Sequence, residues 1–216
     1  MRMPSRLILL ALASTALAGC KSAGEIVVEE GVGISAVRST CPAVGLAEYT
    51  GDITLFSRPG ATDAASIDLV ASLTNIRSTC NSETDKVQAS VSYTVQARRT
   101  DTRGARDVTL PTFVTVIRGT NSVVAKRLSA VTLHFADGQE RAQAQGQGAA
   151  VIDKAEATLD PAVRARITRR RSAGEADAAI DPLADPTVRA AVARASFEVL
   201  VGFQLDDKQL AYNATR

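Results

Sequence analysis

The 216-residue chain carries few residues that could do covalent or metal chemistry: three cysteines and one histidine, His134. The cysteines lack a C-x-x-C spacing and only one histidine is present, so no metal site is predicted. His134 alternates with Leu133 and Phe135, which predicts an exposed position on the polar face of a strand. Any Ser/His/Asp triad would need this histidine, and no G-x-S-x-G sequence occurs, so no catalytic residue is predicted. The absence of a P-loop or dinucleotide fingerprint likewise predicts no cofactor.

Cys20 ends a sequence that is typical of an exported lipoprotein. Arg2 and Arg6 precede an apolar run at residues 7–17. This run is too short for a ~30 Å hydrocarbon core, which needs ~20 helical residues, but it has the length of a signal-peptide core. The tetrapeptide Leu17-Ala18-Gly19-Cys20 resembles the bacterial lipobox, in which small residues admit a peptidase and the thiol carries diacylglycerol. The alternative is an ordinary secretory signal with a chance cysteine.

These features predict a signal peptide at 1–19, lipidation at Cys20, a tether at 20–35 and a folded domain at 36–216. Two or more acyl chains give stable attachment, so the membrane is the first predicted partner. Lys21 follows the cysteine, and by resemblance to enteric lipoproteins a residue other than Asp there favours the outer membrane. We therefore expect a protein on the periplasmic face of the cell outer membrane, with the inner membrane as the open alternative.

The two remaining cysteines, Cys41 and Cys80, each end the same tetrapeptide, R-S-T-C. An even pair in an oxidising compartment predicts a disulfide. Closing a loop of about 40 residues would stabilise the domain by roughly 4 kcal/mol in the chain-entropy model. A reactive thiol or a metal site is the alternative.

One dense charge cluster stands out from an otherwise balanced chain. Without residues 1–19 the chain has 23 basic and 23 acidic residues, which argues against nucleic-acid binding. The cluster could bind the phosphates of lipid headgroups or lipopolysaccharide, or it could be a solvated helix end whose charge suits the helix dipole. Its members are Arg164, Arg166, Arg169, Arg170 and Arg171.

Most of the domain shows strand periodicity, most clearly at residues 87–98, where apolar and polar residues alternate strictly. Spacings of roughly ten to fifteen residues with turn signals between them predict an all-β fold. We expect an antiparallel β-sandwich like those of immunoglobulin or fibronectin type III domains, with a small closed barrel as the alternative. The predicted strands are 28–37, 52–56, 67–74, 87–98, 113–117, 123–135, 140–152 and 197–203.

Residues 160–194 break this pattern. Asp160-Pro161 and Asp185-Pro186 each combine a carboxylate that can cap free amides with a proline that lacks the amide to be capped. They predict two short helices, joined by a linker at 172–184 and inserted before the last core strand.

Several motifs resemble a family of uncharacterised alphaproteobacterial lipoproteins. They are Cys41-Pro42, the later Cys80, Leu110-Pro111, and the ending L-V-G-F-Q-L at 200–205 with L-A-Y-N at 210–213. The resemblance covers about 170 residues, and the C-terminal motif is its specific part. It implies an envelope location and no particular mechanism. The insertion at 160–194 departs from the family pattern, so any role of its arginines would belong to a subgroup.

Two functions are compatible with these observations. The first is a non-enzymatic binding or structural module that contacts an envelope protein or peptidoglycan through sheet edges and loops. The second is a lipid or glycan carrier, or an enzyme, which would need polar residues converging at the strand ends.

We predict that Cys20 carries lipid, because the basic residues, the apolar run and L-A-G-C occur in the required order. Metabolic labelling with an alkyne fatty acid should mark the wild-type protein and leave Cys20→Ser unmarked. Equal labelling of the two proteins would refute the assignment.

Overall fold

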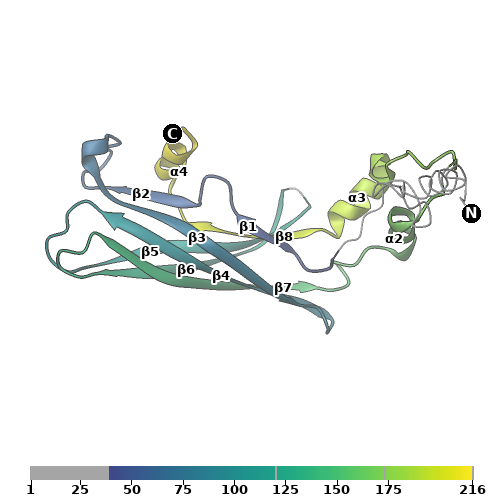
Figure 1. The fold of residues 1–216 in the computed structure, drawn as a ribbon, viewed down its shortest axis with the longest axis horizontal. Coiled ribbons are helices and arrows are strands. Elements are labelled where there is room, and N and C mark those ends of the chain that lie inside the picture. Colours follow the sequence, from purple (N-terminus) through teal and green to yellow (C-terminus); the bar gives the residue numbers. More distant parts are fainter. Residues whose placement is uncertain (1–38, 120, 173, 216) are drawn as a thin grey trace, which may run out of the picture.

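The computed structural model describes residues 39–119, 121–172 and 174–215, and Figure 1 shows them as an elongated β-sandwich. The predicted signal peptide, Cys20, the tether and the strand expected at 28–37 lie outside the described residues. Two four-stranded sheets have the orders β1-β8-β5-β6 and β2-β3-β4-β7, which confirms an all-β sandwich. The strands are β1 (Ala43–Leu46), β2 (Asp52–Phe56), β3 (Ile67–Asn81), β4 (Lys86–Arg99), β5 (Arg106–Arg118), β6 (Ser122–Phe135), β7 (Arg141–Asp153) and β8 (Phe197–Phe203).

The sheets follow from strict alternation along long strands. In β4, the side chains from Val87 to Ala97 that face the other sheet are buried, while Gln88, Ser90 and Ser92 face water. All neighbouring strands are antiparallel except β1, which runs parallel to β8. The apolar faces of both sheets form one core, so burial fixes the register of each strand.

Several elements differ from the prediction. β3 and β5 are longer than expected, and β1 and the C-terminal helix α4 (Asp207–Thr215) were not predicted. β5 extends upstream of the predicted strand 113–117 and runs through Pro111. The reason is that β8 ends opposite Thr112, so Pro111 lies beyond the last pair with β8, where its missing amide costs no bond to that strand.

Gly146 and Gly148 lie in the edge strand β7 and face the interior. A Cβ atom at 146 would lie 2.1 Å from the ring of Tyr93, and one at 148 would lie 2.3 Å from Val114 Cγ2. At 148 only glycine therefore lets β7 approach β5 of the other sheet this closely, and at 146 only glycine leaves room for the Tyr93 ring of the neighbouring strand β4.

Between β7 and β8 lie two α-helices within residues 160–194, where two short helices were predicted, and Figure 1 shows them beyond one end of the sandwich. Asp160 caps α2 (Pro161–Thr168) by accepting from Ala162 N at 2.8 Å, and Asp185 caps α3 (Pro186–Arg194) by accepting from Thr187 N at 2.7 Å. The linker also holds an unpredicted 3-10 turn, Pro182–Ala184, which begins at a third Asp-Pro pair. A separate small core holds the insertion together: Leu159, Ile167, Val188 and Val192.

The predicted disulfide is confirmed: Cys41 is bonded to Cys80, with their Cα atoms 6.0 Å apart. Cys41 precedes β1 in one sheet and Cys80 lies near the end of β3 in the other. The bond therefore joins the two sheets at one end of the sandwich. At this end β3 is no longer paired with β2, because that pairing stops at Ser72.

Arg99 joins the two sheets at the opposite end. Its side chain is 1% exposed, and its guanidinium carbon lies 5.2 Å from the centre of the Phe135 ring. The guanidinium donates four hydrogen bonds of 2.8–2.9 Å to backbone carbonyls, which satisfies a charge that burial alone would make costly. The carbonyls belong to the β4–β5 and β6–β7 loops: Thr102, Gly104, Ala136 and Gln139.

We predict that Arg99→Met costs about 3–5 kcal/mol in the free energy of unfolding, because it removes four charge-assisted hydrogen bonds to loop carbonyls at a buried position. Its neighbour Arg98 is exposed and pairs with Glu140 on the surface. Arg98→Met should therefore cost at most about 1 kcal/mol. Urea unfolding of both variants measures the difference, and equal losses would contradict the role given to Arg99.

We also predict that residues 160–194 are dispensable for folding, because their apolar residues form a cluster separate from the main core. An apolar stripe of this size contributes a few kcal/mol at most. A short Gly/Ser linker in their place should leave a folded, disulfide-bonded domain that melts a few degrees lower. Circular dichroism of an unfolded chain would instead make the insertion part of the core.

Candidate functional site

The outer surface of β3, β4 and β7 is lined by hydroxyl and amide side chains, and we call it the polar face. Strand pairing aligns these side chains in rows across the sheet. Side chains directly opposite one another on neighbouring strands lie close enough to act together on one ligand. Three rows form its centre: Arg77–Ser92–Gln147, Thr74–Thr94–Gln145 and Ser72–Gln96–Gln143.

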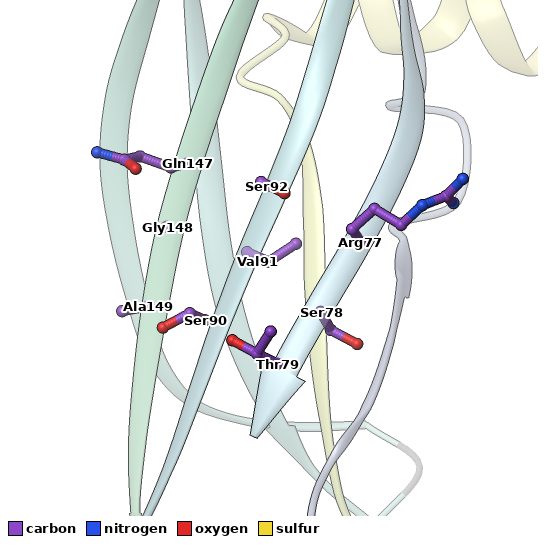
Figure 2. A pocket seen from close by; sticks show the side chains of 9 residues that line it. All are labelled: Arg77, Ser78, Thr79, Ser90, Val91, Ser92, Gln147, Gly148 and Ala149. Carbon is purple, nitrogen blue, oxygen red and sulfur yellow. The ribbon is translucent and has the colours of Figure 1, made fainter. Parts of the chain in front are cut away.

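A hollow of about 420 Å³ lies at one end of the polar face (Figure 2). Small side chains on three neighbouring strands, Thr79, Ser90 and Ala149, are directly opposite one another in this part of the sheet. The longer Gln147 and Arg77 stand on its two sides, on β7 and β3 (Figure 2). The hollow is thus a shallow depression with backbone at its floor.

A second hollow, of about 710 Å³, lies further along the same face, and its lining includes Ser72, Gln96 and Gln143. The row between the two hollows is held by hydrogen bonds. Gln145 Nε2 donates to Thr94 Oγ1 at 3.0 Å, and Thr74 Oγ1 donates to the Thr94 carbonyl at 3.3 Å. The polar face therefore consists of two depressions in line, separated by a fixed polar ridge.

Charge lies mainly at the ends of the polar face. Lys86 pairs with Asp153 at one end, and Arg98 pairs with Glu140 at the other. Between them the side chains carry hydroxyl and amide groups, apart from Arg77, which donates to the Ile76 carbonyl. Arg98 and Arg141 line the second hollow. Such a surface has both donors and acceptors, with arginines at its hollows, so it suits a ligand rich in hydroxyl and amide groups.

A larger groove, of about 940 Å³, lies between α4 and β2, the strand at the edge of this sheet opposite to β7. Phe56 and Tyr212 form part of its lining, and their rings pack edge to face with the ring centres 5.3 Å apart. Asn213 Nδ2 also donates to the carbonyls of Tyr49 and Asp52, each at 2.8 Å. These bonds fasten the C-terminal helix to the sandwich, so the groove is a product of that attachment.

Asp68 at the edge of this groove is bound by Arg106 through two hydrogen bonds, of 2.8 and 2.7 Å. These bonds, more than the burial that opposes them, hold the pKa of the Asp68 carboxyl below its usual range. The pair is thus an ion pair at neutral pH, and Asp68 is not placed to act as a general acid.

The predicted arginine cluster does not converge on one point. Arg166 pairs with Asp185 at 2.8 Å, and Arg169 pairs with Glu175 and Asp177. Arg171, 5% exposed, lies beside the same Asp177. Within the described part of the chain, Arg164 and Arg170 are the cluster members without an ion pair. Three of the five arginines therefore bind carboxylates of the insertion itself.

His134 is exposed, as predicted, and its Nδ1 lies 2.8 Å from a carboxylate oxygen of Asp107 on the neighbouring strand. No group of three His, Cys, Asp or Glu residues that could hold a metal ion occurs among the residues described. Within the same residues, no helix is both long and apolar enough to cross a membrane.

The sequence placed the polar side chains of β4 in water but did not identify a polar face. Gln143, Gln145 and Gln147 alternate with alanine and glycine, which gave only a weak strand signal. Their place beside the hydroxyls of β4 depends on the pairing of β4 with β7, which are separated by two strands of the other sheet. Alternating Gln, Ser and Thr on two strands was the available signal.

Comparison of the chain with protein-family models, with curated proteins and with solved structures gave no match.

Proposed function

We propose that this protein is a lipid-anchored, non-enzymatic binding module on the periplasmic face of the outer membrane, and that the polar face binds the glycan strands of peptidoglycan. The observation that carries the proposal is the hydroxyl- and amide-lined surface with two hollows in line. A glycan strand is an extended polymer whose hydroxyl and acetamido groups match such donors and acceptors. The lipobox-like sequence ending at Cys20 supports the location.

The alternative, a carrier or an enzyme, would need a ligand cavity or a converging set of reactive side chains. Between the sheets, apolar side chains pack into one core, and at Gly146 and Gly148 there is no room even for a methyl group. These contacts favour recognition on the outer surface over enclosure of a ligand between the sheets.

We propose likeness to immunoglobulin and fibronectin type III domains in architecture and not in strand order. Two packed, mainly antiparallel sheets support the likeness. In immunoglobulin constant domains, however, the last strand lies next to the penultimate one, whereas β8 lies between β1 and β5.

We predict that Ser90→Tyr weakens binding to purified peptidoglycan at least tenfold, equivalent to about 1.4 kcal/mol, because the ring fills the first hollow. Thr109 is the matched control: it is also an exposed hydroxyl on a strand, but it lies on the outer face of the other sheet, bonded to Thr132. Co-sedimentation with sacculi measures both variants. Unchanged binding by Ser90→Tyr, or equal loss by Thr109→Tyr, would refute the polar face as the site.

A further inference from the structure

Residues 122–130 of β6 form an exposed sheet edge. β6 is the last strand of its sheet, and along these nine residues the side chains on both faces are exposed. The inner face is open because β7 lies across β5 here: Val114 of β5 is the side chain that approaches Gly148. This half of β6 therefore has one covered side, the hydrogen-bonded edge it shares with β5.

The edge exposes large apolar side chains. Val123 is 63% exposed, Val124 49% and Leu128 69%. Stable proteins usually cover or shorten such an edge, because its free backbone groups and apolar side chains pair readily with another extended segment. A free sheet edge of this kind can take part in β-strand addition.

The charge of the edge points to an acidic occupant. Lys126 Nζ lies 4.5 Å from the centre of the Phe113 ring. Within residues 39–215, apart from the two omitted positions, neither Lys126 nor Arg127 forms an ion pair with a carboxylate. An extended segment with carboxylates beside β-branched apolar residues would satisfy both the charges and the apolar side chains.

We propose that residues 25–30 of this same chain, E-I-V-V-E-E, add to the free edge of β6 as a fifth strand of its sheet. The segment has three consecutive β-branched apolar residues between carboxylates, a composition typical of strands. It overlaps the strand predicted at 28–37 and lies outside the described residues. The inference does not rest on the proposed function, because the polar face belongs to the other sheet.

The connection is long enough. Ser39 lies at the end of the sheet where β8 begins, lining a hollow with Ser196 and Phe197. Phe197 pairs with Arg118, which pairs with Ser122 at the start of β6. The distance from β1 to a strand beyond β6 is about four strand spacings, ~19 Å. Residues 31–38 can span about 26 Å and include two glycines.

The direction of the chain also fits. β6 runs away from this end of the sheet, whereas a chain that arrives at Ser39 must run toward it. The added strand would therefore be antiparallel to β6, the arrangement that gives the better hydrogen bonds. The side chains of Glu29 and Glu30 would then lie within reach of Lys126 and Arg127.

Amide hydrogen exchange of the full-length protein in detergent micelles tests the proposal. Val27→Pro removes a strand amide and should speed exchange at residues 122–130 at least tenfold. Ser22→Pro, upstream of the segment, is the matched control and should leave exchange unchanged. The double variant Glu29→Lys/Glu30→Lys should also speed exchange, and Lys126→Glu/Arg127→Glu in the same chain should restore protection.

Three outcomes would overturn the proposal. Equal exchange in the wild type and Val27→Pro would mean that the segment does not cover the edge. Protection that falls on dilution would assign the edge to a second copy of the chain. Protection that appears only with anionic lipid vesicles would assign it to the membrane surface.

Discussion

The buried guanidinium of Arg99 is the interaction on which the two-sheet arrangement most depends. A charge this deep in the molecule needs hydrogen-bond partners, and its four carbonyl partners come from two of the loops that carry the chain from one sheet to the other. The loops must therefore keep the shapes that aim those carbonyls at Arg99. Because β4, β5, β6 and β7 all end at these loops, their positions are fixed together.

A second constraint acts at the other end, where the disulfide joins the start of one sheet to the end of a strand in the other. Between these two points the sheets approach so closely that only glycine fits at 148, opposite Val114 of the other sheet. The consequence is a filled interior, and the surfaces left for recognition are the outer faces and the edges.

Much of this fold could be predicted from sequence, because a strand that buries one face has apolar and polar residues in alternation. Residues 87–98, the paired cysteines and the Asp-Pro helix starts each have a local physical signature. Arg99 had none: it follows the exposed Arg98 and was expected at or beyond the strand end, and its burial depends on loops brought together by tertiary structure. The same holds for the polar face, because no local pattern tells which strands become neighbours. β1 is four residues long, too short for periodicity to be visible.

The position of the disulfide has a mechanical consequence. Cys80 belongs to β3, the strand that carries Arg77 and Thr79 on the polar face, and Cys41 is among the first residues of the folded domain. A pull between a polymer held on that face and an anchor at the N-terminus would travel along β3 and across the sulfur–sulfur bond. From Cys41 onward that route is covalent, so there the load bypasses the hydrogen bonds among β1 to β8 and the contacts between the sheets. The disulfide would carry the force, and the strands of the sandwich would not be pulled apart from one another.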